Sequence, residues 1–178
     1  MTKIPTVMSI AGSDSGGGAG IQADIKTIAA NGVYGTTVIT AVTAQNTMGV
    51  IDVQEMSIEL VESQINAIMA DIGADAVKTG MLSSAEMILC VSKKIQEYGI
   101  GKFVLDPVMV ATSGDSLLKE DAVESIKRLL IPLCSIVTPN GPEAKELTGI
   151  NVQDLDSARD AAIELVNMGA GAAVVKGG

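Results

Sequence analysis

The sequence predicts an α/β domain with a mostly parallel central sheet that is covered by helices on both faces. Apolar segments typical of buried strands alternate along the 178 residues with segments of helical periodicity. Apolar residues make up 47% of the chain but aromatic residues only 2%. The core must therefore consist of Val, Ile, Leu, Ala and Met, which is typical of buried parallel strands. We expect a single domain over residues 1–178, long enough to bury a substantial core.

Six apolar segments are predicted strands, and helical segments lie between most of them. The strands are expected at 5–11, 35–44, 75–79, 102–106, 134–138 and 172–176. The helices are expected at about 19–31, 58–72, 84–98, 117–130 and 156–168. Asp156 is a candidate helix N-cap, and Gly99 and Gly169 are candidate helix ends. The segment 45–57 fits neither periodicity and is expected to form a short hairpin or a mobile flap.

Charge and cysteine content exclude several classes of function. The formal net charge of −9 makes nucleic acid and anionic membrane surfaces poor partners. No apolar segment approaches the ~20 residues that a bilayer-spanning helix needs, and residues 1–6 contain no signal peptide. Cys90 and Cys134 are expected to be buried as small apolar side chains, and two unclustered cysteines fit a reducing cytoplasm. The lack of His excludes Ser–His–Asp and Cys–His catalysis.

The most informative segment is the glycine-rich turn from Ala11 to Asp24, which reads AGSDSGGGAGIQAD. It follows a predicted strand and leads into a predicted helix, an order that lets backbone N–H groups face an anion or a polar ligand. Asp14 and Asp24 flank the turn. Because a site for phosphate alone would not favour two carboxylates, they suggest a ligand with hydrogen-bond donors.

Polar side chains also follow the other predicted strands. Ligands of open parallel sheets bind outside the carboxyl ends of the strands, so these side chains are candidates for one site. They are Gln45 and Asn46, Lys78, Asp106, Asn140 with Glu143, and Lys176.

The chemistry of these groups predicts phosphoryl transfer from a nucleotide. Carboxylates such as Asp106 and Glu143 could hold Mg²⁺. Asn140 could bind the metal or a phosphate oxygen, and lysines could neutralise phosphate charge. The remaining pair, Gln45 with Asp24, offers the donors and acceptors that would recognise a heterocycle with an exocyclic amine.

Two other nucleotide motifs are disfavoured. The chain has no G-x-x-x-x-G-K-[ST] segment, which excludes a P-loop. Residues 18–23 match the G-x-G-x-x-A dinucleotide fingerprint, but the turn before them is too long. The second predicted strand ends in Gln45-Asn46 and not in the acidic residue that a ribose would require.

The glycine-rich segment resembles the N-terminal signature of the hydroxymethylpyrimidine/phosphomethylpyrimidine kinases of thiamine biosynthesis. Later blocks resemble the same family in the same order: 40–47 (TAVTAQNT), 77–82 (VKTGML), 104–109 (VLDPVM), and 138–140 (TPN) followed by Glu143-Ala144. The resemblance covers essentially the whole chain. It implies a three-layer αβα ribokinase-like domain, ATP and Mg²⁺ as cofactors, and a cytoplasmic homodimer that acts on a small pyrimidine.

The resemblance also assigns roles to individual residues. The pyrimidine-binding residues it implies are Gly12, Asp24, Gln45, Met81 and Val108. The nucleotide- and phosphate-binding residues it implies are Asn140 and Lys176, and the metal ligands are Asp106 and Glu143. The glycine-rich turn with Asp14 and Asp24 is then interpreted as part of the acceptor pocket and not as an anion cradle.

The implied reaction is ATP-dependent phosphorylation of 4-amino-5-hydroxymethyl-2-methylpyrimidine and of its monophosphate. The family's catalytic Gly-Thr-Gly-Cys loop, which forms the anion hole, is not in these 178 residues. We therefore expect a C-terminally truncated, incomplete fold that holds no catalytic residue and is inactive as it stands. A pyridoxal or pyridoxine kinase of the same superfamily and a non-catalytic pyrimidine-binding fragment are the alternatives.

Overall fold

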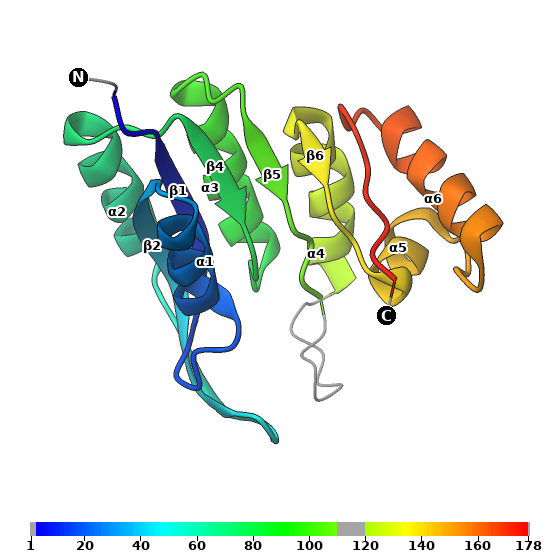
Figure 1. Cartoon of the computed structure of the whole chain (residues 1–178), viewed down its shortest axis with the longest axis horizontal. Coiled ribbons are helices and arrows are strands. Elements are labelled where there is room, and N and C mark those ends of the chain that lie inside the picture. The colour runs from blue at the N-terminus through cyan, green and yellow to red at the C-terminus, as the bar shows by residue number, and fades with distance from the viewer. Residues whose placement is uncertain (1–2, 110–119, 178) are drawn as a thin grey trace.

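The structure is a computed structural model that describes residues 3–109 and 120–177. At its centre lies a six-stranded sheet (Figure 1). Its strands are β1 (Thr6–Asp14), β2 (Tyr34–Asn46), β3 (Gly49–Glu55), β4 (Ala76–Thr79), β5 (Phe103–Leu105) and β6 (Ile136–Val137). They lie in the order β3-β2-β1-β4-β5-β6. All neighbouring strands are parallel except β2 and β3, which pair antiparallel.

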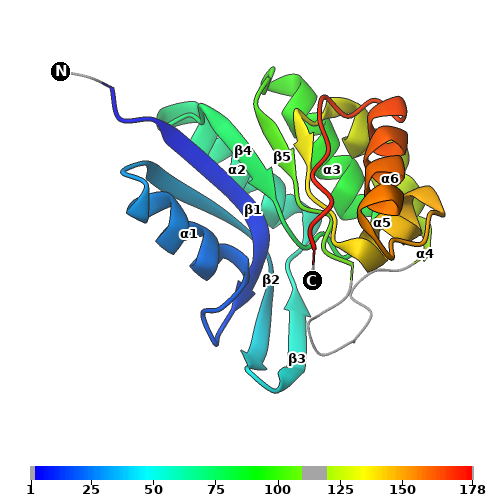
Figure 2. The same ribbon diagram turned by 45° about the vertical axis from the view of Figure 1, so that its right-hand side comes forward.

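Helices cover the sheet on both faces, which confirms the predicted mixed α/β class. The helices are α1 (Gly20–Ala30), α2 (Ile58–Asp71), α3 (Ala85–Glu97), α4 (Glu120–Ser125), α5 (Gly141–Thr148) and α6 (Leu155–Asn167). Helix α1 lies over one face of β1 and β2, whereas α2 and α3 lie on the opposite face (Figure 2). A π-helical turn and a 3₁₀ turn continue α4 as far as Leu133. No helix among the described residues is long and apolar enough to cross a membrane.

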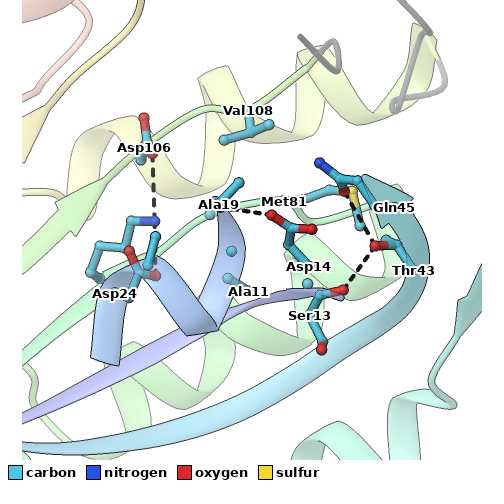
Figure 3. A pocket seen from close by; sticks show the side chains of 15 residues that line it. Ala11, Ser13, Asp14, Ala19, Asp24, Thr43, Gln45, Met81, Asp106 and Val108 are labelled. Atoms are coloured by element: carbon cyan, nitrogen blue, oxygen red, sulfur yellow. Dashed lines mark hydrogen bonds and ion pairs between the residues drawn. The ribbon is translucent and has the colours of Figure 1, made fainter. Parts of the chain in front are cut away.

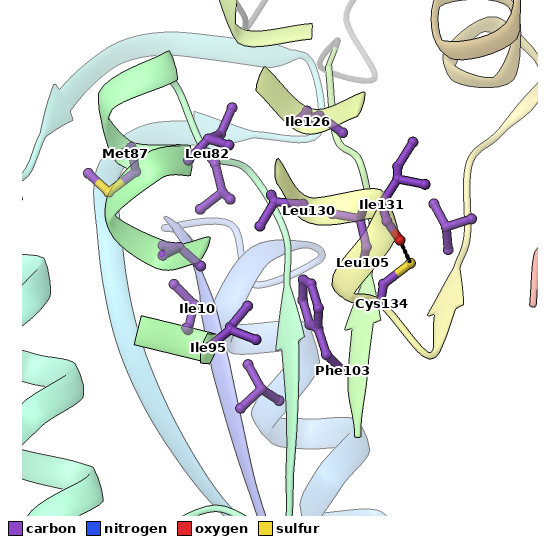
Figure 4. Packing of buried hydrophobic residues seen from close by; sticks show 14 of the residues in the cluster. Ile10, Leu82, Met87, Ile95, Phe103, Leu105, Ile126, Leu130, Ile131 and Cys134 are labelled. Atoms are coloured by element: carbon purple, nitrogen blue, oxygen red, sulfur yellow. Dashed lines mark hydrogen bonds between the residues drawn. The ribbon is translucent and has the colours of Figure 1, made fainter. Parts of the chain in front are cut away.

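The main core lies between the sheet and the layer that α2, α3 and α4 form. Phe103 and Leu105 of β5 are fully buried there, against Ile95 of α3 and Leu130 of the π-helical turn (Figure 4). Met8 and Ile10 of β1 extend the same cluster. Aliphatic side chains dominate it, as the composition predicts. This core fixes the strands whose carboxyl ends carry the polar residues.

Five of the predicted strands are present, most of them with small shifts of their ends. Strand β1 is longer than predicted because it continues as far as Asp14, into the glycine-rich segment. Of the two interpretations of residues 45–57, the hairpin is confirmed: β3 folds back on the end of β2. Residues 172–176 run beside β6 but make only two isolated parallel bridges, Val137 with Ala173 and Asn140 with Lys176.

Two helix predictions need correction. Helix α5 was not predicted, because eight residues that include a proline carry little periodicity. It nevertheless begins with a capping box, in which the side chains of Asn140 and Glu143 each accept the other residue's backbone N–H. Helix α6 is capped by Asp154 and not by Asp156, since the Asp154 carboxylate accepts the N–H of Ser157.

Other helix ends agree with prediction. Gly99 directly follows the C-cap of α3 and Gly169 that of α6, both with positive φ. Residues 117–119 of the predicted helix 117–130 lie outside the described residues, and the described helix begins at Glu120.

Candidate functional site

A pocket of about 270 Å³ lies at the carboxyl ends of β1, β2, β4 and β5 (Figure 3). It is the position where open parallel sheets bind ligands. Fifteen residues line the pocket, and they include all five of the predicted pyrimidine-binding residues: Gly12, Asp24, Gln45, Met81 and Val108. The structure therefore brings together residues from four separate segments of the sequence, of which the glycine-rich segment supplies both Gly12 and Asp24. Their binding role stays a prediction.

The glycine-rich turn is held by the carboxylate of Asp14. One oxygen, Oδ1, accepts the N–H of Gly16 at 2.8 Å, and Oδ2 accepts those of Gly18 at 2.9 Å and Ala19 at 2.8 Å. The residue is buried, at 5% exposure. These N–H groups and this carboxylate are thus satisfied within the turn. The prediction that turn N–H groups face an anion is therefore wrong for these three groups. Asp14 also lines the pocket, and its contact with hydrogen-bond donors of a ligand stays a prediction.

Other side chains fix the turn from outside. The Gln22 amide accepts the N–H of Asp14 at 2.8 Å and donates to the Ser13 hydroxyl at 2.7 Å. Lys26 donates to the carbonyl of Gly17 at 2.8 Å. Both residues come from α1, so the helix and the turn hold each other in place.

One glycine of this segment is required by its geometry. Gly20 has φ +56°, and a Cβ at that position would overlap the carbonyl oxygen of Gly12. In any other residue the left-handed backbone would cost stability, and the Cβ would also push Gly12 away from its place in the pocket wall.

Charged side chains alternate in sign across the pocket. Lys78 Nζ lies 3.1 Å from Asp24 Oδ2 and 3.5 Å from Asp106 Oδ2. Lys176, which is not among the pocket-lining residues, places its Nζ 2.9 Å from Asp106 Oδ1. Asp24 also accepts a 2.6 Å hydrogen bond from the hydroxyl of Ser9. Asp24, Lys78, Asp106 and Lys176 thus form one ionic chain. It contains one predicted pyrimidine-binding residue (Asp24), one predicted metal ligand (Asp106) and one predicted phosphate-binding residue (Lys176).

Gln45 is held at both its backbone and its side chain. The Ser15 hydroxyl accepts the backbone N–H of Gln45 at 2.8 Å and donates to its carbonyl at 2.7 Å. The side-chain amide lies 3.2 Å from the Thr43 hydroxyl. Strand β2 thereby presents the Gln45 amide to the pocket in a defined position.

The apolar part of the pocket comes from Met81 and Val108. The Met81 side chain packs so closely on Gly12 that a Cβ on Gly12 would lie 2.9 Å from the Met81 Cε. Figure 3 shows Val108 on the β5 side of the same opening. These two side chains give this part of the pocket an apolar wall.

Asn140 and Glu143 lie beside this pocket and not in its lining. Glu143 is 4% exposed, and its Oε2 accepts the N–H of Asn140 at 2.8 Å. Burial raises the pKa of the Glu143 carboxyl, while Asn140 and Lys176 act in the opposite direction. Asp106 adds to the rise as a like charge. Among residues 3–109 and 120–177, no group of three or more acidic or cysteine side chains is arranged to hold a metal. The Asp106–Glu143 metal site stays a prediction.

Both cysteines are buried free thiols, as predicted. Burial raises the pKa of the Cys134 thiol to about 11 and also raises that of Cys90. Neither residue lines the pocket.

Sequence reasoning missed Ser9, Ser15 and Thr43 as supports of the site. Each is a small hydroxyl residue in or next to a strand, which gives no signal by itself. The missed contacts join segments about 15 to 30 residues apart along the chain, so only the fold reveals them.

Comparison with known proteins identifies the family of this chain. The family model described as phosphomethylpyrimidine kinase matches residues 14–178. A hydroxymethylpyrimidine/phosphomethylpyrimidine kinase of Bacillus subtilis is 53% identical over 99% of this chain and 65% of its own length. The enzyme of the same name from Haemophilus influenzae is 47% identical over 100% of this chain and 66% of its own length. The chain thus spans slightly less than two thirds of the length of these curated relatives.

Solved structures of two kinds of kinase have the same fold as this chain. A phosphomethylpyrimidine kinase of Clostridium difficile has a TM-score of 0.90 at 47% identity, over 99% of this chain and 76% of that one. A Bacillus subtilis pyridoxal kinase in complex with ADP also reaches 0.90, at 35% identity, over 99% of this chain and 67% of that one. Since the family model matches nearly the whole chain and relatives of that name share about half of its residues, the chain belongs to the phosphomethylpyrimidine kinase family.

Proposed function

We propose that the complete protein carrying this chain transfers the γ-phosphoryl group of ATP to the hydroxymethyl oxygen of 4-amino-5-hydroxymethyl-2-methylpyrimidine. In a second reaction it phosphorylates the monophosphate. The observation that carries the proposal is that Gly12, Asp24, Gln45, Met81 and Val108 all line one pocket. Family membership supports the reaction class. Relatives solved with ADP and with AMP-PCP support ATP as the donor.

The pocket residues would position the acceptor. Met81 and Val108 would contact the ring faces, and Gln45 would hydrogen-bond the polar edge of the ring. Phosphoryl transfer depends mainly on positioning and on electrostatic stabilisation, so a fixed ring orientation that points the CH₂OH group at the donor is the main contribution expected of this pocket.

Lys176 would act on the donor phosphates. Its side chain is 44% exposed and is held on Asp106 by one ion pair, so it can turn toward a phosphate oxygen. Asn140 accepts the N–H of Glu143 through its side-chain oxygen, which leaves its amide nitrogen as a donor to a phosphate. Both groups would offset charge on the nucleotide.

Mg²⁺ fits the donor chemistry at this edge. The ion prefers oxygen ligands and binds through one or two carboxylates together with substrate phosphates. Asp106 and Glu143 supply such oxygens, and they are close enough to influence one another electrostatically. When bound there, Mg²⁺ would neutralise charge on the phosphates.

The test is turnover by the complete protein with ATP and the aminopyrimidine, followed by phosphorus NMR of the product. Gln45→Leu should raise KM by about 5- to 150-fold, because a buried hydrogen bond to the ring contributes about 1–3 kcal/mol. Gln54→Leu is the matched control, since Gln54 is exposed on β3 and lies outside the pocket. The proposal is wrong if the protein phosphorylates pyridoxal but not the aminopyrimidine.

A pyridoxal kinase is the second candidate. Pyridoxal is also a small heteroaromatic ring with a CH₂OH group, and a pyridoxal kinase of Staphylococcus aureus solved with pyridoxal has a TM-score of 0.90 at 32% identity. The higher identity to pyrimidine kinases makes this candidate the weaker one.

We further propose a cytoplasmic homodimer. Two free buried thiols fit a reducing compartment. The β2–β3 hairpin exposes Met48 at 87% and Ile51 at 76%, which favours contact with a second copy. Sedimentation equilibrium would test the dimer, and a monomer at micromolar concentration would contradict it.

A further inference from the structure

The hydroxyl of Thr43 faces two oxygen atoms but has only one proton. Its Oγ1 lies 2.9 Å from the carbonyl oxygen of Ser13 and 3.2 Å from the side-chain oxygen of Gln45. The Ser13 carbonyl can only accept, and it is the closer of the two. The single proton of Thr43 therefore belongs to that carbonyl.

The amide of Gln45 must then donate to Thr43. Its oxygen and nitrogen ends have nearly the same shape, so the hydrogen-bond partners decide which end lies where. With the Thr43 proton engaged, the amide end at 3.2 Å makes a hydrogen bond only if it is the NH₂ group. The other end, which points away from Thr43 in Figure 3, is then the carbonyl oxygen.

Burial and backbone contacts hold this arrangement. Thr43 is 6% exposed, so water has little access to its hydroxyl. Thr43 and Gln45 are two residues apart on β2, on either side of a register shift between Ala44 and Gln45, and both line the pocket. The Ser15 hydroxyl fixes the Gln45 main chain at both its N–H and its carbonyl, which leaves mainly the side-chain torsions free.

We propose that Thr43 is a positioning residue that sets the Gln45 amide with its nitrogen on the Thr43 hydroxyl and its oxygen toward the pocket. The inference deepens the proposed function and rests on it for the identity of the ligand. An inward carbonyl oxygen requires a hydrogen-bond donor on the ring. Thr43 thus affects which ligand the pocket accepts through the orientation of the Gln45 amide.

The substituent next to the CH₂OH-bearing carbon is where the candidate ligands differ. The aminopyrimidine carries an amine there, which donates to the inward oxygen. Its 4-oxo analogue carries a ring carbonyl oxygen there and pyridoxal carries a formyl group, and neither substituent has a proton to donate to the Gln45 oxygen. A site that leaves a polar pair unmatched discriminates strongly against such a ligand.

The experiment measures calorimetric Kd values of the complete protein for the aminopyrimidine and for its 4-oxo analogue. The preference is the Kd for the 4-oxo analogue divided by the Kd for the aminopyrimidine. In Thr43→Val the Gln45 amide is free to rotate, so this ratio should fall by about fivefold or more. Thr43→Ser keeps the hydroxyl and should keep the ratio within about twofold. The matched control is Thr36→Val on the same strand, because the Thr36 hydroxyl contacts the Val7 carbonyl but not Gln45.

A second variant keeps the test decisive if Thr43→Val does not fold. Gln45→Glu places an oxygen at both ends of the side chain and should retain the preference for the amine, whereas Gln45→Leu should remove it. The inference is overturned if Gln45→Glu reverses the preference, if Thr43→Val leaves the ratio unchanged, or if Thr36→Val lowers it equally.

The two proposals can fail separately. If the wild-type protein phosphorylates the aminopyrimidine but the Kd ratio does not depend on Thr43, only the role of Thr43 is overturned. A Thr43-dependent preference in binding without phosphoryl transfer overturns only the kinase function.

Discussion

Gly20→Ala should destabilise the protein far more than an equivalent change at Gly32. Both glycines have positive φ, +56° at Gly20 and +71° at Gly32. An alanine at either position therefore carries a backbone cost of about 1–2 kcal/mol. Nothing lies within 4 Å of a Cβ built on Gly32, whereas a Cβ on Gly20 would overlap the carbonyl oxygen of Gly12.

The overlap at Gly20 cannot be relieved by a side-chain rotation, because the obstacle is main chain. Moving the turn away from Gly12 strains the hydrogen bonds that Asp14 accepts from Gly16, Gly18 and Ala19. Loss of one such bond to a carboxylate costs about 1.5–3 kcal/mol. The expected loss for Gly20→Ala is thus about 2.5–5 kcal/mol, against about 1–2 kcal/mol for Gly32→Ala.

Urea unfolding followed by circular dichroism measures both free energies, and calorimetry with the aminopyrimidine measures the pocket. Gly20→Ala should also weaken pyrimidine binding, because Gly12 forms part of the pocket wall. Equal losses of unfolding free energy in the two variants would refute the argument from close approach.

Three further predictions concern charged and titratable groups. Lys78→Met should lower the unfolding free energy by about 1–2 kcal/mol, since it leaves the part-buried Asp24 and Asp106 without their shared cation. Lys127→Met removes only an exposed pair with Glu124 and should lower the unfolding free energy by less than about 0.5 kcal/mol. Equal losses in urea unfolding would count against the ionic chain. Hydrogen bonds from Lys3 and Thr6 lower the pKa of Asp75 to about 2, so the stability that ionised Asp75 contributes is present above its unfolded pKa of 3.8 and is lost as the pH falls toward 2. A carboxyl titration by NMR with a midpoint near 3.8 would contradict this. Cys90 and Cys134 should react with a thiol reagent at pH 8 only slowly in the native protein and rapidly in denaturant, because burial raises both thiol pKa values; fast native labelling would show that they are not buried.

The sheet was predictable because the apolar segments are long and strongly patterned, and their alternation with helical segments fixes a parallel arrangement. Helix α5 was missed because its signal is local. The capping pair Asn140 and Glu143, with Pro142 in the first turn, marks a helix start. The sequence pattern predicts a ligand role for the same two side chains, and in the fold their oxygens cap the helix.

The members of the pocket were predictable, but the state of each polar group was not. The sequence places Asp14 and Asp24 on either side of a glycine-rich turn, and nothing in their spacing separates their roles. In the fold, Asp14 accepts three N–H groups of the turn, whereas Asp24 faces Lys78 and lines the pocket. The difference arises from the path of the main chain between Asp14 and Gly20, which positive φ at Gly17 and Gly20 makes possible.

The ionic chain through Asp24, Lys78, Asp106 and Lys176 has a consequence for ligand binding. Its two carboxylates and two ammonium groups balance, so neither end presents an uncompensated charge to the pocket. A phosphate that draws Lys176 away leaves Asp106 with Lys78 as its remaining ionic partner, at 3.5 Å. A cation at Asp106 would restore the balance and would also release Lys176 for the phosphate. If phosphate binds at Lys176 and Mg²⁺ at Asp106 as proposed, the two should bind more strongly together than either does alone.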